Sequence, residues 1–138
     1  MNLTNNFTLE ELIHSEIADR NHVQNDPDPD VVERLTDLCK YVLQPCRDRL
    51  DAVITVTSGF RSPVVNALAK GALDSQHIKG EAADMKCFSL GNKALYNALK
   101  EGGIYDQLIW EYGNDQEPDW VHVSFRKEGN RKQELRIY

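Results

Sequence analysis

Residues 75–84 read SQHIKGEAAD and offer two metal-type ligands around a glycine. His77 supplies an imidazole and Asp84 a carboxylate, a pair that zinc accepts when a further histidine completes a three-ligand site with one open position. Gly80 lets the backbone turn between them, and residues 81–85 begin with small residues and then resemble a buried strand. Taken alone, such a pair is more often a turn cap and a hydrogen-bonded surface group. The prediction of a metal site therefore depends on a third ligand.

His122 is the third ligand that the pattern offers. Residues 120–125 alternate as a strand does, so Trp120, His122 and Ser124 share one face while the intervening valines point to the core. Asp119 precedes His122 by three residues. There a carboxylate can reach a water molecule on the metal without binding the metal itself, which is the position of a general base.

Upstream of these motifs, an arginine follows a predicted strand. The β-branched run at 53–57 predicts the strand, and Ser62 is the expected cap of a short helix over 63–69. Arg61 therefore lies at a strand-to-helix corner. Two roles remain open for it, namely pairing with a carboxylate such as Asp84 or holding an anionic group of a substrate.

Helices dominate the N-terminal third. A capping box at residues 8–11 predicts a helix that continues to about residue 19. Asp28, followed by proline, predicts the start of a longer helix whose apolar residues recur at threes and fours through residue 50, with Pro45 as the expected kink. His14 and His22 fall on polar faces or connections, and we expect both to be exposed.

The C-terminal half predicts a sheet. Ser89 is the expected cap of a helix that stops at residues 102–103, and residues 107–110 predict a strand that a turn joins to the strand at 120–125. Residues 133–137 predict a last edge strand. The sequence thus predicts a single α+β domain, with helices packed on a mainly antiparallel sheet.

Composition excludes several classes of protein. The 138 residues fit one domain, and with 41% hydrophobic and 28% charged residues they are typical of a soluble globular chain. No apolar run approaches the ~20 residues of a membrane span, and the first residues lack a secretory signal, so we expect cytoplasmic synthesis without a signal peptide. The net charge of −6 argues against nucleic acid as a partner. Three cysteines without a CxxC spacing predict reduced core thiols.

Four motifs occur in a fixed order: SGFRS at 58–62, then Asn66, then SxHxxGxAxD at 75–84, and WxHxS at 120–124. Each is weak alone, but together they resemble the zinc D-alanyl-D-alanine peptidases of bacterial cell walls. That family shares its fold with the Hedgehog signalling domain and includes carboxypeptidases, dipeptidases and phage-encoded endolysin peptidases. The resemblance is strongest over residues 35–125, and it implies a Hedgehog/DD-peptidase-like fold for the whole chain.

The resemblance also assigns roles at the metal. It implies that His77, Asp84 and His122 bind one catalytic zinc ion (Zn²⁺). It implies that Asp119 is the catalytic acid and base. Many members carry glutamate rather than aspartate at that position, and the shorter side chain reaches about one methylene less, so Glu117 is a reserve candidate.

Three further residues are implied to handle the substrate. Arg61 is expected to stabilise the transition state or to hold a terminal carboxylate, Ser75 to contact the substrate, and Trp120 to form a wall of the binding groove. Trp110 and Tyr112 are possible groove walls as well, although core packing is the default for at least one of these aromatic residues.

The predicted function is zinc-dependent cleavage of the peptidoglycan stem peptide, by a D-Ala-D-Ala carboxypeptidase or a murein endopeptidase. The expected setting is a monomeric endolysin of phage type that reaches the cell wall after release. One alternative is a cytoplasmic D-alanyl-D-alanine dipeptidase. Another is a zinc-binding module of the same fold without catalysis, against which the acid at Asp119 argues.

Overall fold

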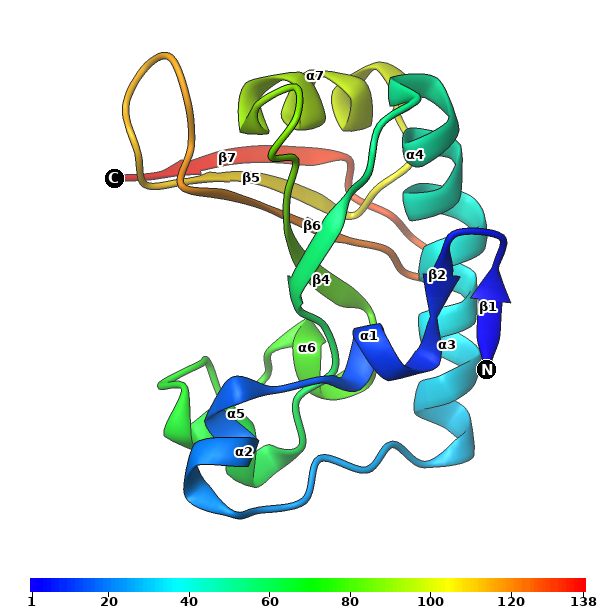
Figure 1. Cartoon of the computed structure of the whole chain (residues 1–138), viewed down its shortest axis with the longest axis vertical. Coiled ribbons are helices and arrows are strands. Elements are labelled where there is room, and N and C mark those ends of the chain that lie inside the picture. Colours follow the sequence, from blue (N-terminus) through cyan, green and yellow to red (C-terminus); the bar gives the residue numbers. More distant parts are fainter.

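A five-stranded sheet forms the centre of the computed structural model, which describes all 138 residues (Figure 1). In spatial order its strands are β3 (Thr55–Ser58), β4 (Ala82–Lys86), β6 (Trp120–Ser124), β5 (Gln107–Glu111) and β7 (Gln133–Ile137). The first four strands pair antiparallel, whereas β7 pairs parallel to β5. The sheet is therefore mixed, which corrects the expectation of a mainly antiparallel sheet. After β6 the chain crosses over β5 and adds β7 at the far side of β5, so that β7 runs in the same direction as β5.

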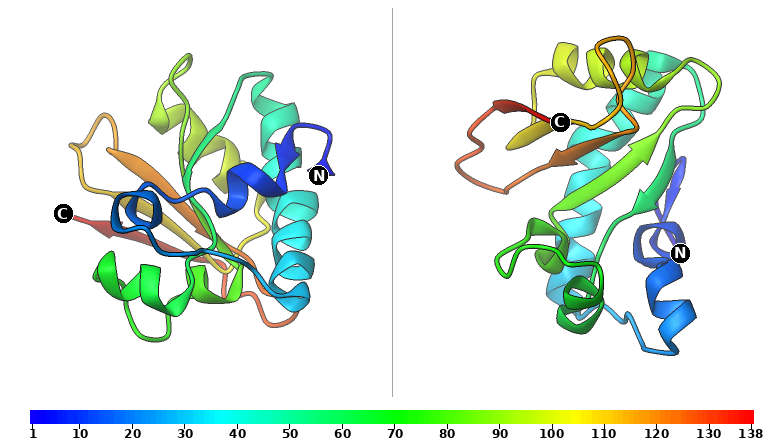
Figure 2. Two further views of the ribbon diagram at one scale, coloured as in Figure 1. Left: turned by 60° about the horizontal axis from the view of Figure 1, so that its bottom comes forward. Right: turned by 90° about the vertical axis from the view of Figure 1, so that its left-hand side faces the viewer.

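One continuous helical rod packs on the sheet (Figures 1 and 2). It consists of α3 (Pro29–Leu38), the π-helical turn η1 (Cys39–Leu43) and α4 (Gln44–Leu50). In η1 the Gln44 N–H donates to the carbonyl of Cys39, five residues back. The irregularity thus precedes Pro45, which lies in the first turn of α4, where a proline is tolerated.

The core lies between the rod, helix α7 (Asn92–Gly102) and one face of the sheet. Alternate residues of β4 and β6 point into it, including Met85 and Val121, both fully buried. Because side chains alternate along a strand, Asp84 and His122 are on the opposite face. The three cysteines are buried free thiols, as predicted. None of the helices combines the length and apolar character that a bilayer crossing requires.

The N-terminal segment differs in detail from the prediction. A small hairpin of β1 (Asn2–Thr4) and β2 (Phe7–Thr8) comes first, and the predicted helix is divided into α1 (Leu9–Ile13) and α2 (Glu16–Asn21). The capping box of Thr8 and Glu11 is confirmed. Ser15 causes the division, because its hydroxyl accepts a hydrogen bond from the Ala18 N–H at 3.1 Å and begins a second helix.

Two short helices, α5 (Pro63–Leu68) and α6 (Gln76–Lys79), lie beside the ends of β3 and β4 (Figure 1). Ser62 caps α5 as predicted, with its hydroxyl accepting from the Val65 N–H. Helix α7 begins after Gly91 rather than at Ser89, and it ends at Gly103, whose positive φ of 71° suits glycine.

Candidate metal centre

Three of the predicted ligands meet at one point. Asp84 on β4 and His122 on β6 are directly opposite each other in the sheet, and His77 comes from α6. Asp84 Oδ1 lies 2.9 Å from His122 Nδ1 and 3.5 Å from His77 Nε2. One ligand atom from each of the three residues lies within 4.8 Å of the others. The structure therefore brings together a group able to hold one metal ion.

The local sequence orients His77. Ser75 caps α6 by accepting a hydrogen bond from the His77 N–H at 3.1 Å, and Gly80 ends the helix with a φ of 77°. The Nδ1 atom of His77 is 2.7 Å from the carbonyl oxygen of Gly59. A proton on Nδ1 donated to this carbonyl leaves Nε2 free to accept a metal, a common arrangement for a histidine ligand.

Arg61 holds the second oxygen of Asp84. Its Nη2 donates to Asp84 Oδ2 at 3.3 Å, while Nε donates to Ser58 Oγ at 3.1 Å and Nη1 to Asn66 Oδ1 at 3.4 Å. The guanidinium is thus fixed from three directions. Of the two roles left open for this arginine, the ion pair with Asp84 is present.

The Asp84 carboxyl remains ionised at the centre. Burial alone would raise its pKa, but the charges and hydrogen bonds of His77 and His122 outweigh burial and hold the pKa well below its usual range. His77 and Asp84 are only 4% and 8% exposed. Two imidazole nitrogens and one anionic oxygen, with little competing water, form a donor set that suits zinc with an open fourth position.

Glu111 is a site residue that the sequence interpretation missed. It is directly opposite Trp120 in the register of β5 and β6, and so it shares the face of His122. Burial, and then the negative charge of Asp84, raise the pKa of this half-buried carboxyl, against the opposing charges of His122 and Arg61. The alternation of side chains along residues 107–111 shows that Gln107, Ile109 and Glu111 share one face of the strand. Only the register with β6 shows that this is the face of His122.

Asp119 and Glu117 differ in their surroundings. The side chain of Asp119 is exposed, while its main-chain N–H donates to the Glu111 carbonyl at 2.9 Å. Glu117 Oε2 accepts a hydrogen bond from the Lys93 N–H at 2.8 Å, at the start of α7. The carboxylate of Glu117 is thus engaged in capping that helix.

The aromatic residues divide between the two faces of the sheet. Trp120 packs against Tyr112 with ring centroids 5.4 Å apart, and its indole N–H is buried without a hydrogen-bond partner. Trp110 points to the other face, where it packs against Tyr96 of α7. Trp120 therefore shares the face of His122, and Tyr112 contacts Trp120. His14 and His22 are exposed, as predicted.

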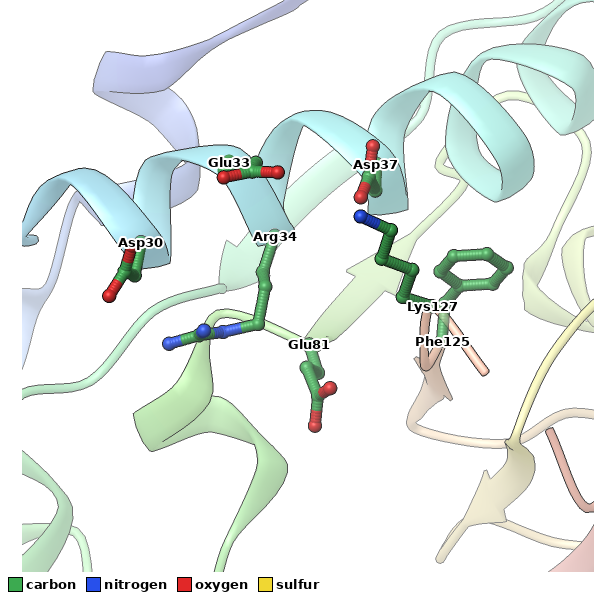
Figure 3. Close-up of a pocket in the computed structure, with 7 residues that line it drawn as sticks. All are labelled: Asp30, Glu33, Arg34, Asp37, Glu81, Phe125 and Lys127. Carbon is green, nitrogen blue, oxygen red and sulfur yellow. The ribbon is translucent and has the colours of Figure 1, made fainter. Parts of the chain in front are cut away.

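Two grooves lie near these elements. We call the first the His122 groove, because His122 forms part of its wall; its other lining residues are Asp74, Ser75, Gln76, Lys79, Gln107, Ile109, Arg126 and Arg131. The second groove lies between α3 and the segment after β6, and it is lined by Asp30, Glu33, Arg34, Asp37, Glu81, Phe125 and Lys127 (Figure 3). Only the His122 groove contains a residue of the metal cluster.

Two histidines and one aspartate around one point, at the side of an open groove, form a donor set of the kind that zinc hydrolases use. The sequence model of the peptidase M15 family matches residues 5–124. The chain belongs to this family, and the family resemblance of its motifs is confirmed. The chain is therefore a member of a peptidase family and carries a His–Asp–His group able to hold a metal ion.

One curated relative is the zinc D-Ala-D-Ala carboxypeptidase of Streptomyces albus G. It is 36% identical to this chain over 85 residues, which are 61% of this chain. The chain spans about a third (32%) of the length of that relative. The match thus concerns one part of a longer protein.

Proposed function

We propose that this chain hydrolyses peptide bonds in the stem peptide of bacterial peptidoglycan. The observation that carries the proposal is the cluster of His77, Asp84 and His122 beside a groove lined by residues of α6, β5, β6 and the adjoining loops, in a member of a peptidase family. The name of the Streptomyces relative supports a D-alanyl peptide as the substrate. A Hedgehog/DD-peptidase-like fold is part of the same proposal.

The residues divide the chemistry among them. His77, Asp84 and His122 would hold the zinc ion, which would supply a Lewis acid able to lower the pKa of a water molecule and to polarise a peptide carbonyl. A nearby carboxylate accepts the proton of the attacking water and returns it to the leaving amine. We assign Arg61 to stabilising negative charge on the reacting carbonyl oxygen, since it is held beside Asp84. Ser75 and Trp120 would contact the substrate.

Two carboxylates compete for the proton-transfer role. Asp119 is the residue that the motif spacing favours. Glu111 is the one that its position favours, because it is half-buried on the face of His122.

Substitutions separate these roles. Zinc-loaded wild-type protein should release D-alanine or peptides from defined muropeptides, and mass spectrometry of the products distinguishes a carboxypeptidase from an endopeptidase. His122→Ala should lose zinc and activity together. The variants Asp119→Asn and Glu111→Gln should both retain zinc, and the one that replaces the base should lower kcat by about 100-fold or more.

Two outcomes would overturn the proposal. Full zinc retention without turnover of any murein substrate would favour the non-catalytic zinc module. Exclusive turnover of free D-alanyl-D-alanine would favour the dipeptidase. The proposed setting, a monomeric endolysin acting on the cell wall, is tested by light scattering and by adding the protein to purified sacculi.

A further inference from the structure

The His122 groove has a basic lining in an acidic protein. Three cationic side chains, from Lys79, Arg126 and Arg131, line it together with one carboxylate, that of Asp74. The whole chain carries a net charge of −6. An excess of positive charge next to the metal cluster is therefore a local feature rather than a consequence of composition, and it would attract an anionic group.

A buried carboxylate fixes two of these cations. Asp106, which is fully buried, accepts hydrogen bonds from Arg131 Nε at 3.0 Å and from Arg131 Nη2 at 2.7 Å. Its Oδ2 atom also lies 3.3 Å from Arg126 Nε. Asn130 holds the intervening loop by exchanging hydrogen bonds with the main chain of Arg126. The guanidinium groups are thus held in place before any ligand arrives.

The ion pairs leave donors free. Arg126 approaches Asp106 through Nε, and Arg131 donates to it through Nε and Nη2, whereas the other guanidinium nitrogens of the two arginines make no hydrogen bond. Both Nη atoms of Arg126 and Nη1 of Arg131 therefore remain available to a ligand. One carboxylate also balances only one of the two guanidinium charges. Fixed planar donors with an uncompensated charge are suited to binding a carboxylate.

We propose that Lys79, Arg126 and Arg131 form a subsite for a carboxylate of the peptide substrate, separate from the group that reacts at the metal. The subsite selects peptides that carry an acidic side chain or a free α-carboxylate at a fixed distance from the scissile bond. Arg61 is next to Asp84 and does not line this groove, so the two sets of cations engage different parts of the substrate. This inference rests on the proposed peptidase function.

The test uses matched peptides on the full-length zinc-loaded protein. Each pair ends in D-alanyl-D-alanine and differs only in one carboxylate against its carboxamide, placed either at the C-terminal carboxyl group or on a side chain two or three residues before the scissile bond. Isothermal titration calorimetry with the corresponding product peptides measures binding without turnover, and KM and kcat are measured in parallel. In one placement the acid should bind about tenfold more tightly and show a lower KM, with a similar kcat.

Three variants locate the effect. Arg126→Gln and Lys79→Gln should each reduce the acid preference to about twofold or less, and Lys79→Gln leaves the contacts of Asp106 intact if the arginine variant folds poorly. Lys127 is next to Arg126 in the sequence but lines the other groove. Lys127→Gln removes the same charge and should therefore keep the preference for the acidic peptide.

The outcomes distinguish a failure of the carboxylate subsite from a failure of the peptidase proposal. Equal affinities for acid and amide in every placement, or a preference that survives both Arg126→Gln and Lys79→Gln, would overturn the subsite while leaving the peptidase proposal standing. Absence of hydrolysis in the wild type would overturn the peptidase proposal, and calorimetry would still decide whether the carboxylate binds.

Discussion

Replacing Asp106 by asparagine should destabilise the protein, because this one carboxylate ties together the end of the sheet and the loop after β6. The carboxyl is fully buried, and it also accepts a hydrogen bond from the Arg131 main-chain N–H at 2.9 Å. Asparagine keeps the shape and one acceptor but removes the charge. Arg126 and Arg131 would then lose their common anionic partner.

The lowered pKa of Asp106 sets the size of the expected loss of stability. The hydrogen bonds of the Arg131 side chain, opposed by burial and aided by the Arg131 N–H and the charge of Arg126, lower the pKa of Asp106 from 3.8 to about 2. Since one pKa unit corresponds to about 1.4 kcal/mol, the ionised group contributes about 2 kcal/mol to the free energy of unfolding at neutral pH. For a domain of this size the melting temperature should fall by roughly 5–8 °C.

The sign of the pH dependence follows from a lowered carboxyl pKa. The contribution is complete above the ordinary pKa near 4 and is lost as the pH falls toward 2, so the gap between wild type and Asp106→Asn should shrink over that range. Urea unfolding of both proteins at pH 7, 4 and 3 measures this difference in stability. As a control, Asp115→Asn removes the exposed ion pair with Arg136 and should cost less than about 0.5 kcal/mol. Equal stability of Asp106→Asn and wild type at pH 7, or a gap that does not change with pH, would refute the reasoning.

Further predictions concern the metal and the core. Gly59→Ala should cost about 2 kcal/mol of stability and weaken zinc binding, because the new Cβ would lie 2.2 Å from the Leu12 carbonyl oxygen and would displace the Gly59 carbonyl that orients His77. Thermal unfolding measures the stability and chelator competition measures the zinc affinity; wild-type values in both would contradict this prediction. Zinc added at 100 times its Kd to protein stripped of metal by a chelator should raise the free energy of unfolding by about 2.7 kcal/mol. An unchanged melting temperature would argue against the proposed zinc site. Cys39 and Cys46 should resist thiol reagents in native buffer, since burial raises the pKa of each thiol to about 12; rapid labelling without denaturant would contradict their burial.

Local signals were enough to predict which residues would form the His–Asp–His cluster. The alternation along β6 identified the face of His122, and the small residues before Asp84 identified a buried strand. Asp84 and His122 are directly opposite each other in the register of β4 and β6, a pairing that the sequence analysis did not predict. The capping box at residues 8–11 is similarly local, because both of its hydrogen bonds lie within four residues.

Features that depend on long-range pairing were not predictable in this way. Glu111 joins the site only through the register between β5 and β6, and the intervening turn is long enough to allow other registers. The parallel pairing of β7 depends on which edge of the sheet is free. Ser15 lies within a helical pattern, where a serine can occupy either a mid-helix position or a cap. In the structure it caps α2.

The buried thiols have a consequence for how the metal enters the protein. In an unfolded chain Cys39, Cys46 and Cys87 would be accessible zinc ligands, stronger than a carboxylate and able to capture the ion in non-native chelates. In the folded chain all three are enclosed, and the imidazole and carboxylate donors of the cluster lie together beside the groove. Folding before zinc is added should therefore give the higher yield of correctly loaded protein, and refolding in excess zinc should trap part of the chain in misfolded complexes.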